Sequence, residues 1–262
     1  MTKLISRRGR TQIPVVQSTD LQLFASCKND PVLFINSFIK IAHPVKSVCS
    51  FILHPKQKDY VDHLHSNHGT IAMFCRQAGG TSTSLAFLLW EVMVRPNHHT
   101  AILSENHSMR AHNSYLVQFM INHFPEFLRT QVSKLTQHCI EFHNGSKLLF
   151  DTANQSTFRG RTFDRVFVDQ IAYVREDEQP QLWANLSHVS FRGGAVNILS
   201  VPKKSGDIFH QHWATATCGP KTRLEAFKCT IDDATWSNID KNQLRQMIGD
   251  EDFRRQYMCE FV

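Results

Sequence analysis

Short apolar runs alternate along the chain with longer segments of helical periodicity. Four runs have the length and composition of buried strands: residues 70–75, 100–104, 166–169 and 197–201. Three segments space their apolar side chains as helices do: residues 57–65, 85–94 and 107–128. A further helix is expected after Asp30, with Pro31 at its first position and apolar residues as far as Ile41. This alternation of strands and helices predicts an α/β fold.

The order of these elements predicts a doubly wound, mostly parallel sheet with helices on both faces. Residues 139–142 and 147–151 are expected to form a hairpin that turns at Asn144-Gly145. Ligands of such sheets bind at the carboxyl ends of the strands. Three polar loops follow predicted strands, at residues 75–83, 169–170 and 200–206. We therefore expect the functional site at these loops.

The composition is that of an ordinary globular chain, with 42% hydrophobic and 20% charged residues, which excludes a disordered protein. No apolar window is long enough to span a membrane, and the N-terminus lacks the apolar core of a signal peptide. The seven cysteines include no Cys-x-x-Cys pair, so neither a zinc ribbon nor a disulfide scaffold is indicated. A net charge of +6 permits a polyanionic partner. Residues 1–20 are polar and basic, and we interpret them as a flexible arm.

The loop at 75–83 lies between a predicted strand and a predicted helix, where a P-loop protein holds the phosphates of its nucleotide. The Gly-x-x-x-x-Gly-Lys-Ser/Thr pattern is not matched. If Gly79 is its second glycine, Phe74 stands at the first glycine and Gly80 at the lysine. A plain turn of Gly, Ser and Thr residues between strand and helix is therefore an alternative interpretation.

Several motifs, taken in order, resemble those of tailed-phage terminase large subunits. Residues 76–82 resemble the Arg-Gln-x-Gly-Lys-Thr-Thr loop of that family, and residues 166–170 resemble its Walker B strand. The resemblance also covers the lead-in at 30–41, the adenine motif at 55–57, the Arg-Gly element at 158–161, the coupling motif at 199–202, a segment at 206–213 that resembles the family's Gly-x-x-x-Phe-x-x-x-Trp continuation, and the closing segment at 253–261. It extends from about residue 28 to the last residue.

The resemblance implies a P-loop ATPase that drives duplex DNA into a viral procapsid, in the cytoplasm of an infected bacterium. It implies one ATPase domain over residues 21–262, with a helical lead-in at 21–69 that carries the adenine motif and a P-loop core at 70–262. No part of the nuclease domain that follows in the family is expected in this chain. The implied cofactors are ATP and Mg²⁺. The implied partners are double-stranded DNA, the portal ring, the small terminase subunit and further copies of the chain in a ring.

The same resemblance assigns roles to individual residues. The implied nucleotide-binding residues are Gln57, Arg76, Gln77, Gly79, Gly80, Thr81 and Ser82. The implied catalytic positions are Arg76, Asp169 and Gln170; the implied Mg²⁺-binding residues are Thr81 and Asp169; and the implied coupling residues are Ser200 and Val201. The candidates for contact with DNA or a neighbouring subunit are Arg159, Arg161, Lys203 and Lys204, for which a solvated surface is the alternative.

Three departures from the family pattern fall on the chemistry. Gly80 replaces the lysine whose charge stabilises the β- and γ-phosphates. Gln170 stands where the family has the acid that activates the hydrolytic water, and an amide cannot accept that proton. Lys56 replaces the aromatic residue of the adenine motif. ATP hydrolysis is therefore expected to be very slow or absent. The alternatives are a non-catalytic module that binds DNA, a portal or a motor partner, and a helicase-like P-loop protein.

Overall fold

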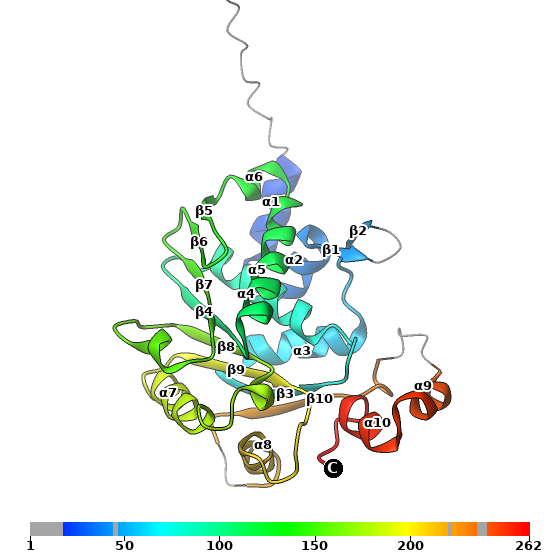
Figure 1. Cartoon of the computed structure of the whole chain (residues 1–262). Helices are drawn as coiled ribbons and strands as arrows, with labels where there is room; N and C mark the ends of the chain where they lie inside the picture. Colours follow the sequence, from blue (N-terminus) through cyan, green and yellow to red (C-terminus); the bar gives the residue numbers. More distant parts are fainter. Residues whose placement is uncertain (1–17, 44–46, 220–221, 235–239) are drawn as a thin grey trace, which may run out of the picture.

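A computed structural model describes residues 18–43, 47–219, 222–234 and 240–262. The strands of its main sheet are β3 (Gly69–Phe74), β4 (His99–Ser104), β5 (Val132–Leu135), β6 (Cys139–Phe142), β7 (Lys147–Thr152), β8 (Arg165–Asp169), β9 (Ala195–Ser200) and β10 (Glu225–Cys229). They lie in the order β10-β3-β9-β8-β4-β7-β6-β5 (Figure 1). Neighbours from β10 to β7 are parallel, whereas β6 and β5 add antiparallel strands at one end. The mostly parallel sheet that the sequence predicts is confirmed.

Helices cover both faces of this sheet (Figure 1). The helices of one face are α3 (Pro55–Ser66), α4 (Gly80–Val94) and α5 (His107–Asn122), and those of the other are α7 (Gln179–Phe191) and α8 (Ile208–Cys218). Strands β3, β8 and β9 are buried along their whole length, as strands are when helices pack on both faces. The predicted fold class is therefore confirmed.

The segment before the sheet is less helical than the sequence predicts. It holds α1 (Ser18–Ser26), η1 (Cys27–Asn29), α2 (Pro31–Phe38) and a small hairpin of β1 (Lys40–His43) and β2 (Ser47–Ser50). The Asp30 carboxylate caps α2 by accepting the Leu33 N–H at 2.7 Å, as expected. The prediction that this helix includes Ile41 is wrong, because Ile39 is already extended and β1 follows. Helix α1 also takes in residues 18–20 of the predicted arm, while residues 1–17 of that arm lie outside the described residues.

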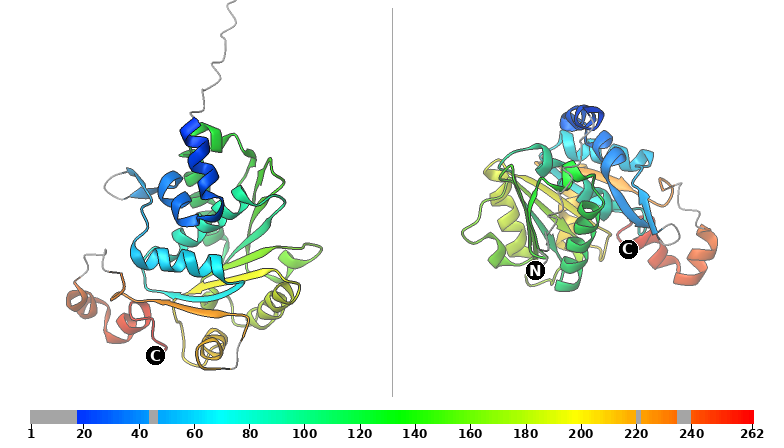
Figure 2. Two further views of the ribbon diagram at one scale, coloured as in Figure 1. Left: turned by 180° about the vertical axis from the view of Figure 1, so that it is seen from behind. Right: turned by 90° about the horizontal axis from the view of Figure 1, so that it is seen from above.

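Other element boundaries also differ from the predictions. The helix predicted over 107–128 is interrupted after Asn122, and α6 (Glu126–Arg129) begins separately after Pro125, which cannot continue a helix. Helix α4 begins at Gly80, within the predicted loop. Strands β5 and β10 and the helices α9 (Lys241–Ile248) and α10 (Asp250–Gln256) were not predicted. Figure 2 shows α9 and α10 together at the β10 end of the sheet.

A buried ion cluster lies toward the end of α4. The Glu91 carboxylate is fully buried and accepts hydrogen bonds from Arg165 Nε at 2.5 Å and Arg165 Nη2 at 2.9 Å. His98 and Arg95 each have a nitrogen 3.1 Å from it. Burial by itself would raise the pKa of Glu91, but the hydrogen bond from His98 and the charge of Arg165 lower it to about 2. Glu91 is therefore held as a carboxylate inside the core.

The sequence also gives expectations about membrane-spanning helices and about the cysteines. In the described part of the chain, no helix has the length and apolar composition that crossing a membrane requires. All seven cysteines lie within the described residues, and each is a free thiol.

Candidate functional site

The carboxyl ends of β3, β9 and β8 meet at one edge of the sheet, as the predicted site requires. The segment between β3 and α4 forms one wall of a pocket of about 210 Å³ at this edge. The pocket is lined by Phe74, Cys75, Arg76, Gln77, Gly79, Gly80, Thr81, Ser82, Gln170, Leu199 and Val201. Most of the predicted nucleotide-binding residues therefore share one pocket with residues of the predicted Walker B and coupling motifs.

The loop before α4 is held in a specific backbone conformation. Gln77 and Gly79 have positive φ angles of 63° and 79°, a region that non-glycine residues rarely adopt. Gln57 lies beneath this loop, where its Nε2 donates to the Ala78 carbonyl at 2.9 Å and its Oε1 accepts the His54 N–H at 3.0 Å. A Cβ atom at position 79 would lie 2.7 Å from Gln57 Nε2. Gln57 thus supports the loop through its amide nitrogen, while its amide oxygen holds the N-terminus of α3.

Asp169, at the end of β8, is the buried acid of the site. It is 1% exposed, and its carboxylate accepts hydrogen bonds from the Thr81 hydroxyl at 3.1 Å and from Asn113 Nδ2 at 2.9 Å. Burial raises the pKa of Asp169 to about 6, although both hydrogen bonds oppose the shift. The two predicted Mg²⁺-binding residues are therefore in direct contact. Asn113, from α5, was missed because nothing in the sequence relates it to β8.

Gln170 connects the end of β8 to the end of β9. Its φ is 59°, and its N–H donates to the Leu199 carbonyl at 2.7 Å. Its side-chain Oε1 accepts the Val201 N–H at 3.4 Å and the Ser200 hydroxyl at 3.5 Å. The side chain at the predicted catalytic position is thus bonded to both predicted coupling residues.

Gly80 packs against the ring of Phe74. A Cβ atom at position 80 would lie 2.7 Å from Phe74 Cγ and 3.0 Å from Phe74 Cδ1. The Gly80 carbonyl accepts the Ser84 hydroxyl at 2.9 Å. The position that carries lysine in the P-loop pattern therefore has no room for a side chain while Phe74 stays in place. Phe74 is the second site residue that the sequence analysis missed, although it stands at the first glycine of that pattern.

The predicted cationic residues are dispersed. Arg76 is exposed at the pocket, and its N–H donates to the Gln256 carbonyl at 2.9 Å. Lys203 Nζ lies 3.8 Å from Glu176, and Arg161 Nη1 lies 3.9 Å from Asp151. The Lys204 N–H donates to Asp207 at 3.3 Å. Neither these three residues nor Arg159 line the pocket beside the loop.

Lys56, at the aromatic position of the adenine motif, has partners outside the pocket. Its Nζ lies 3.7 Å from Asp233 Oδ1 and 5.1 Å from the centre of the Phe227 ring. It therefore offers a paired ammonium group where an aromatic ring would stack on a base.

The chain is similar to proteins of a known family. The family described as "Terminase large subunit, T4likevirus-type, N-terminal" matches residues 71–262, which include the loop, Asp169 and the closing helices. The chain belongs to the terminase large-subunit family. The match includes β3 from its third residue and ends at Val262, and it leaves the helical lead-in outside.

Solved terminase structures have the same fold as this terminase domain. The ATPase domain of the Thermus phage P74-26 large terminase matches with a TM-score of 0.64 at 19% identity, over 80% of this chain and 94% of that one. The HK97 bacteriophage large terminase matches with a TM-score of 0.72 at 15% identity, over 89% of this chain and 55% of that one. The large terminase of a thermophilic bacteriophage, in complex with ADP, matches with a TM-score of 0.62 at 14% identity, over 80% of this chain and 54% of that one. The terminase domain spans about half the length of these last two proteins.

The residues of this terminase domain fit a magnesium ion that is shared with a phosphate ligand. Among the described residues, no three His, Cys, Asp or Glu side chains gather into a metal-binding group. Mg²⁺ is commonly held by one or two protein oxygens, with water and substrate phosphates completing its shell. The Thr81 hydroxyl and the Asp169 carboxylate are such donors, and a cation would offset the burial that raises the pKa of Asp169.

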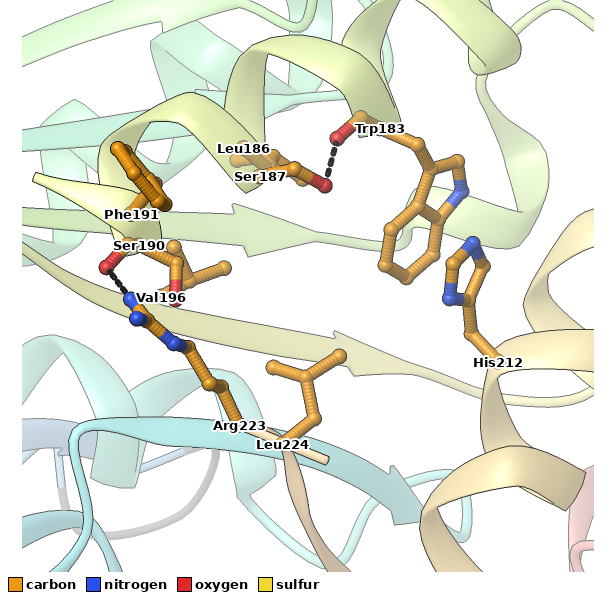
Figure 3. A pocket seen from close by; sticks show the side chains of 9 residues that line it. All are labelled: Trp183, Leu186, Ser187, Ser190, Phe191, Val196, His212, Arg223 and Leu224. Carbon is orange, nitrogen blue, oxygen red and sulfur yellow. Dashed lines mark hydrogen bonds between the residues drawn. The ribbon is translucent and has the colours of Figure 1, made fainter. Parts of the chain in front are cut away.

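A separate hollow of about 260 Å³ lies between α7 and α8 of the terminase domain (Figure 3). Trp183 and His212 stack at its edge, with ring centroids 3.7 Å apart. Arg223 donates to the Ser190 carbonyl on the other side. None of the predicted site residues lines this hollow, so the chemistry expected from the sequence belongs to the loop pocket.

Proposed function

We propose that this terminase domain binds ATP in the loop pocket, together with Mg²⁺, and hydrolyses it very slowly or not at all. The observation that carries the proposal is the 3.1 Å hydrogen bond between Thr81 and Asp169, beside two positions without catalytic charge, Gly80 and Gln170. The ATPase domain then consists of residues 21–262, with the lead-in at 21–69 and the P-loop core at 70–262.

The loop supports nucleotide binding through its backbone. It leads into the first turn of α4, whose N–H groups have no partners within the helix and attract anions. Thr81 and Ser82 add hydroxyl groups, and Gln57 keeps the loop in shape from below. The large terminase of the thermophilic phage, which has the same fold, is known in complex with ADP, and this supports nucleotide binding by the present chain. Thr81 and Asp169 would hold Mg²⁺, which neutralises charge on the phosphates.

Impaired hydrolysis follows from the residues at two positions, Gly80 beside Thr81 and Gln170 beside Asp169. Gln170 can orient a water molecule but cannot accept its proton, and its oxygen already accepts the Val201 N–H. Gly80 supplies no positive charge to the phosphates. Removal of one preorganised charge or donor from such a site costs about 10²–10³ in rate. Arg76, exposed at the pocket, is the cation that we expect to act on a bound nucleotide.

In the packaging motor, we infer that the domain acts on double-stranded DNA in a ring of copies. The portal ring and the small terminase subunit are its expected partners, in the cytoplasm of the infected host and on the procapsid. Arg159, Arg161, Lys203 and Lys204 are the proposed contacts to DNA or to a neighbouring subunit. Family membership supports this role.

The second candidate function is a non-catalytic module that uses the same fold to bind DNA, a portal or an intact motor subunit. The loss of charge at Gly80 and Gln170 favours it, because a module of this kind needs neither group. In that case the nucleotide would be a structural ligand or would not bind.

Titration calorimetry with ATP and Mg²⁺ on the purified chain tests the proposal. We expect a dissociation constant in the micromolar range, and a weaker one for Asp169→Ala. The matched control is Asp62→Ala, which removes an exposed carboxylate outside the loop pocket. No binding at millimolar ATP would reject the proposal and favour the module. A phosphate-release rate equal to that of an intact packaging ATPase would reject the part that concerns hydrolysis.

A further inference from the structure

The ring of Phe74 is fixed by other aromatic side chains and cannot easily move away from Gly80. Its centroid lies 4.7 Å from that of Tyr60 and 5.8 Å from that of Phe227, with which it stacks at 20°. Tyr60 and Phe227 are themselves 5.0 Å apart. We call Tyr60, Phe74 and Phe227 the aromatic wedge. All three come from elements that surround the loop: α3, β3 and β10.

The aromatic wedge holds the start of α4 from two sides. Phe74 is 4% exposed, so its ring has no solvent space to enter. The Tyr60 hydroxyl shares a hydrogen bond of 3.1 Å with Ser84 Oγ, and this oxygen donates to the Gly80 carbonyl. The Cα of Gly80 therefore faces a fixed ring while its carbonyl is tied to the same cluster. A side chain at position 80 requires the wedge to be rebuilt.

The wedge also reaches the adenine-motif position. The Lys56 ammonium lies over the Phe227 ring, and Phe227 stacks on Phe74. Lys56, Phe227, Phe74 and Gly80 thus follow one another in contact. The unusual residues at positions 56, 74 and 80 belong to one packed unit.

We propose that Phe74 determines how this loop holds a phosphate ligand. The Phe74 ring reserves the space beside Gly80, so the loop takes the phosphates through backbone N–H groups and Thr81, without a cation at position 80. The Phe74 ring then requires a glycine at position 80. Residues 74 and 80 would therefore have to change together to match the P-loop pattern. This inference rests on the proposed function, because it describes nucleotide binding in the same pocket.

A comparison of melting temperatures tests the steric part without any nucleotide. Alanine is normally favoured over glycine within a helix. In the unmodified chain we expect the opposite, with Gly80→Ala lowering the Tm by about 3–10 °C because its Cβ overlaps the Phe74 ring. In a chain that already carries Phe74→Ala, the same change should raise the Tm by about 1–4 °C.

This change of sign decides the steric part. A gain in Tm for Gly80→Ala in the unmodified chain would overturn the proposal. That result does not depend on whether the Phe74→Ala variant folds. An equal loss in both backgrounds would overturn it as well, because the loss would then not come from Phe74.

Affinity for ATP with Mg²⁺ tests the functional part. Gly80→Lys alone should bind no more tightly than the unmodified chain, whereas Phe74→Ala with Gly80→Lys should bind at least tenfold more tightly than Phe74→Ala. Gln22→Lys, on the exposed side of α1, adds the same charge outside the pocket and should change nothing. Tighter binding by Gly80→Lys alone would contradict the proposal. If none of the chains binds ATP, the proposed function and the functional part of this inference fail together, and the melting temperatures still decide the steric part.

Discussion

At the scale of single residues, Asp169 is the most unusual ionisable group of the site. It is a carboxyl group buried between a hydroxyl and an amide, and its pKa is raised to about 6. Asn113 is well placed to adapt to a neutral partner, because its own Oδ1 is buried without a hydrogen bond. An amide at position 169 could therefore be accommodated by a flip of Asn113.

We predict that Asp169→Asn stabilises the free protein above pH 6. The folded-state pKa of about 6 exceeds the reference value of 3.8, so the stability of the unmodified chain falls as the pH rises between about 4 and 6. Removal of the charge should recover roughly 3 kcal/mol at pH 7.5 and almost nothing at pH 4. Thermal unfolding of both chains at pH 4, 5, 6 and 7.5 measures the difference. A gain that is the same at every pH would show that Asp169 does not titrate as described.

A second prediction concerns restoration of hydrolysis. Gly80→Lys with Gln170→Glu restores both missing charges, and the new carboxylate at position 170 could keep the acceptor for the Val201 N–H. We nevertheless expect no recovery of steady-state phosphate release, because Phe74 blocks the lysine side chain. Adding Phe74→Ala should raise the rate at least tenfold over the double variant. Full recovery of phosphate release in the double variant would contradict the block by Phe74.

At the scale of elements, α4 joins two sites of different character. Its first residue, Gly80, lies in the loop that lines the pocket, and Glu91 near its other end anchors the ion cluster with Arg165 and His98. Both sites depend on the register of one buried helix.

We predict that Glu91→Gln destabilises the fold by about 3–5 kcal/mol, because Arg165 would remain buried without a counter-charge. The contribution of the carboxylate is present above pH 4.5 and is lost as the pH falls toward its folded-state pKa of about 2. Urea unfolding at pH 7 measures the loss. Glu126→Gln, in an exposed pair with Arg129, is the control and should cost less than about 1 kcal/mol. Equal losses in the two variants would refute the role of burial.

The sequence predicts the elements of this fold where apolar residues are continuous. The runs that became β3, β8 and β9 are buried on both faces, so their patterns are unambiguous. Strand β10 was missed because the charged residues Glu225 and Lys228 interrupt its apolar pattern. Strand β5 was missed because it is largely exposed. The loop pocket was predictable, since parallel strands bring their carboxyl ends to one edge. The contacts of Asn113 and Phe74 were not, because they depend on which helix and which ring pack across the sheet.

At the scale of the whole molecule, the last residues of the chain pack beneath the loop at 75–83. The Arg76 N–H donates to the Gln256 carbonyl, and the Ile231 N–H donates to the Tyr257 carbonyl at 2.8 Å. Phe253 and Cys259 are buried in the same region. Helix α10 and the residues after it are thus part of the core that surrounds the site.

We therefore predict that deletion of residues 249–262 lowers the Tm by more than about 6 °C, because it exposes the core around Phe253 and removes the acceptor of the Arg76 N–H. ATP affinity should fall at least tenfold in the same chain. Arg254→Ala removes only an exposed pair with Glu260 and serves as the control, with little change in either quantity. An unchanged Tm after the deletion would mean that α10 and the residues after it are independent of the core.

The strand order has a consequence for the synthesis of this protein. β3 is made early, but its two neighbours come late, since Gly69 pairs with Val196 and Thr70 with Glu225. On a ribosome, β3 waits for its partners for on the order of ten seconds. During that time β3 is a mostly apolar segment whose two edges are unpaired, and such edges pair readily with other chains. Sheets built from such distant pairs also fold slowly. Misassociation during production is therefore expected to begin at β3, the strand that leads into the loop at 75–83.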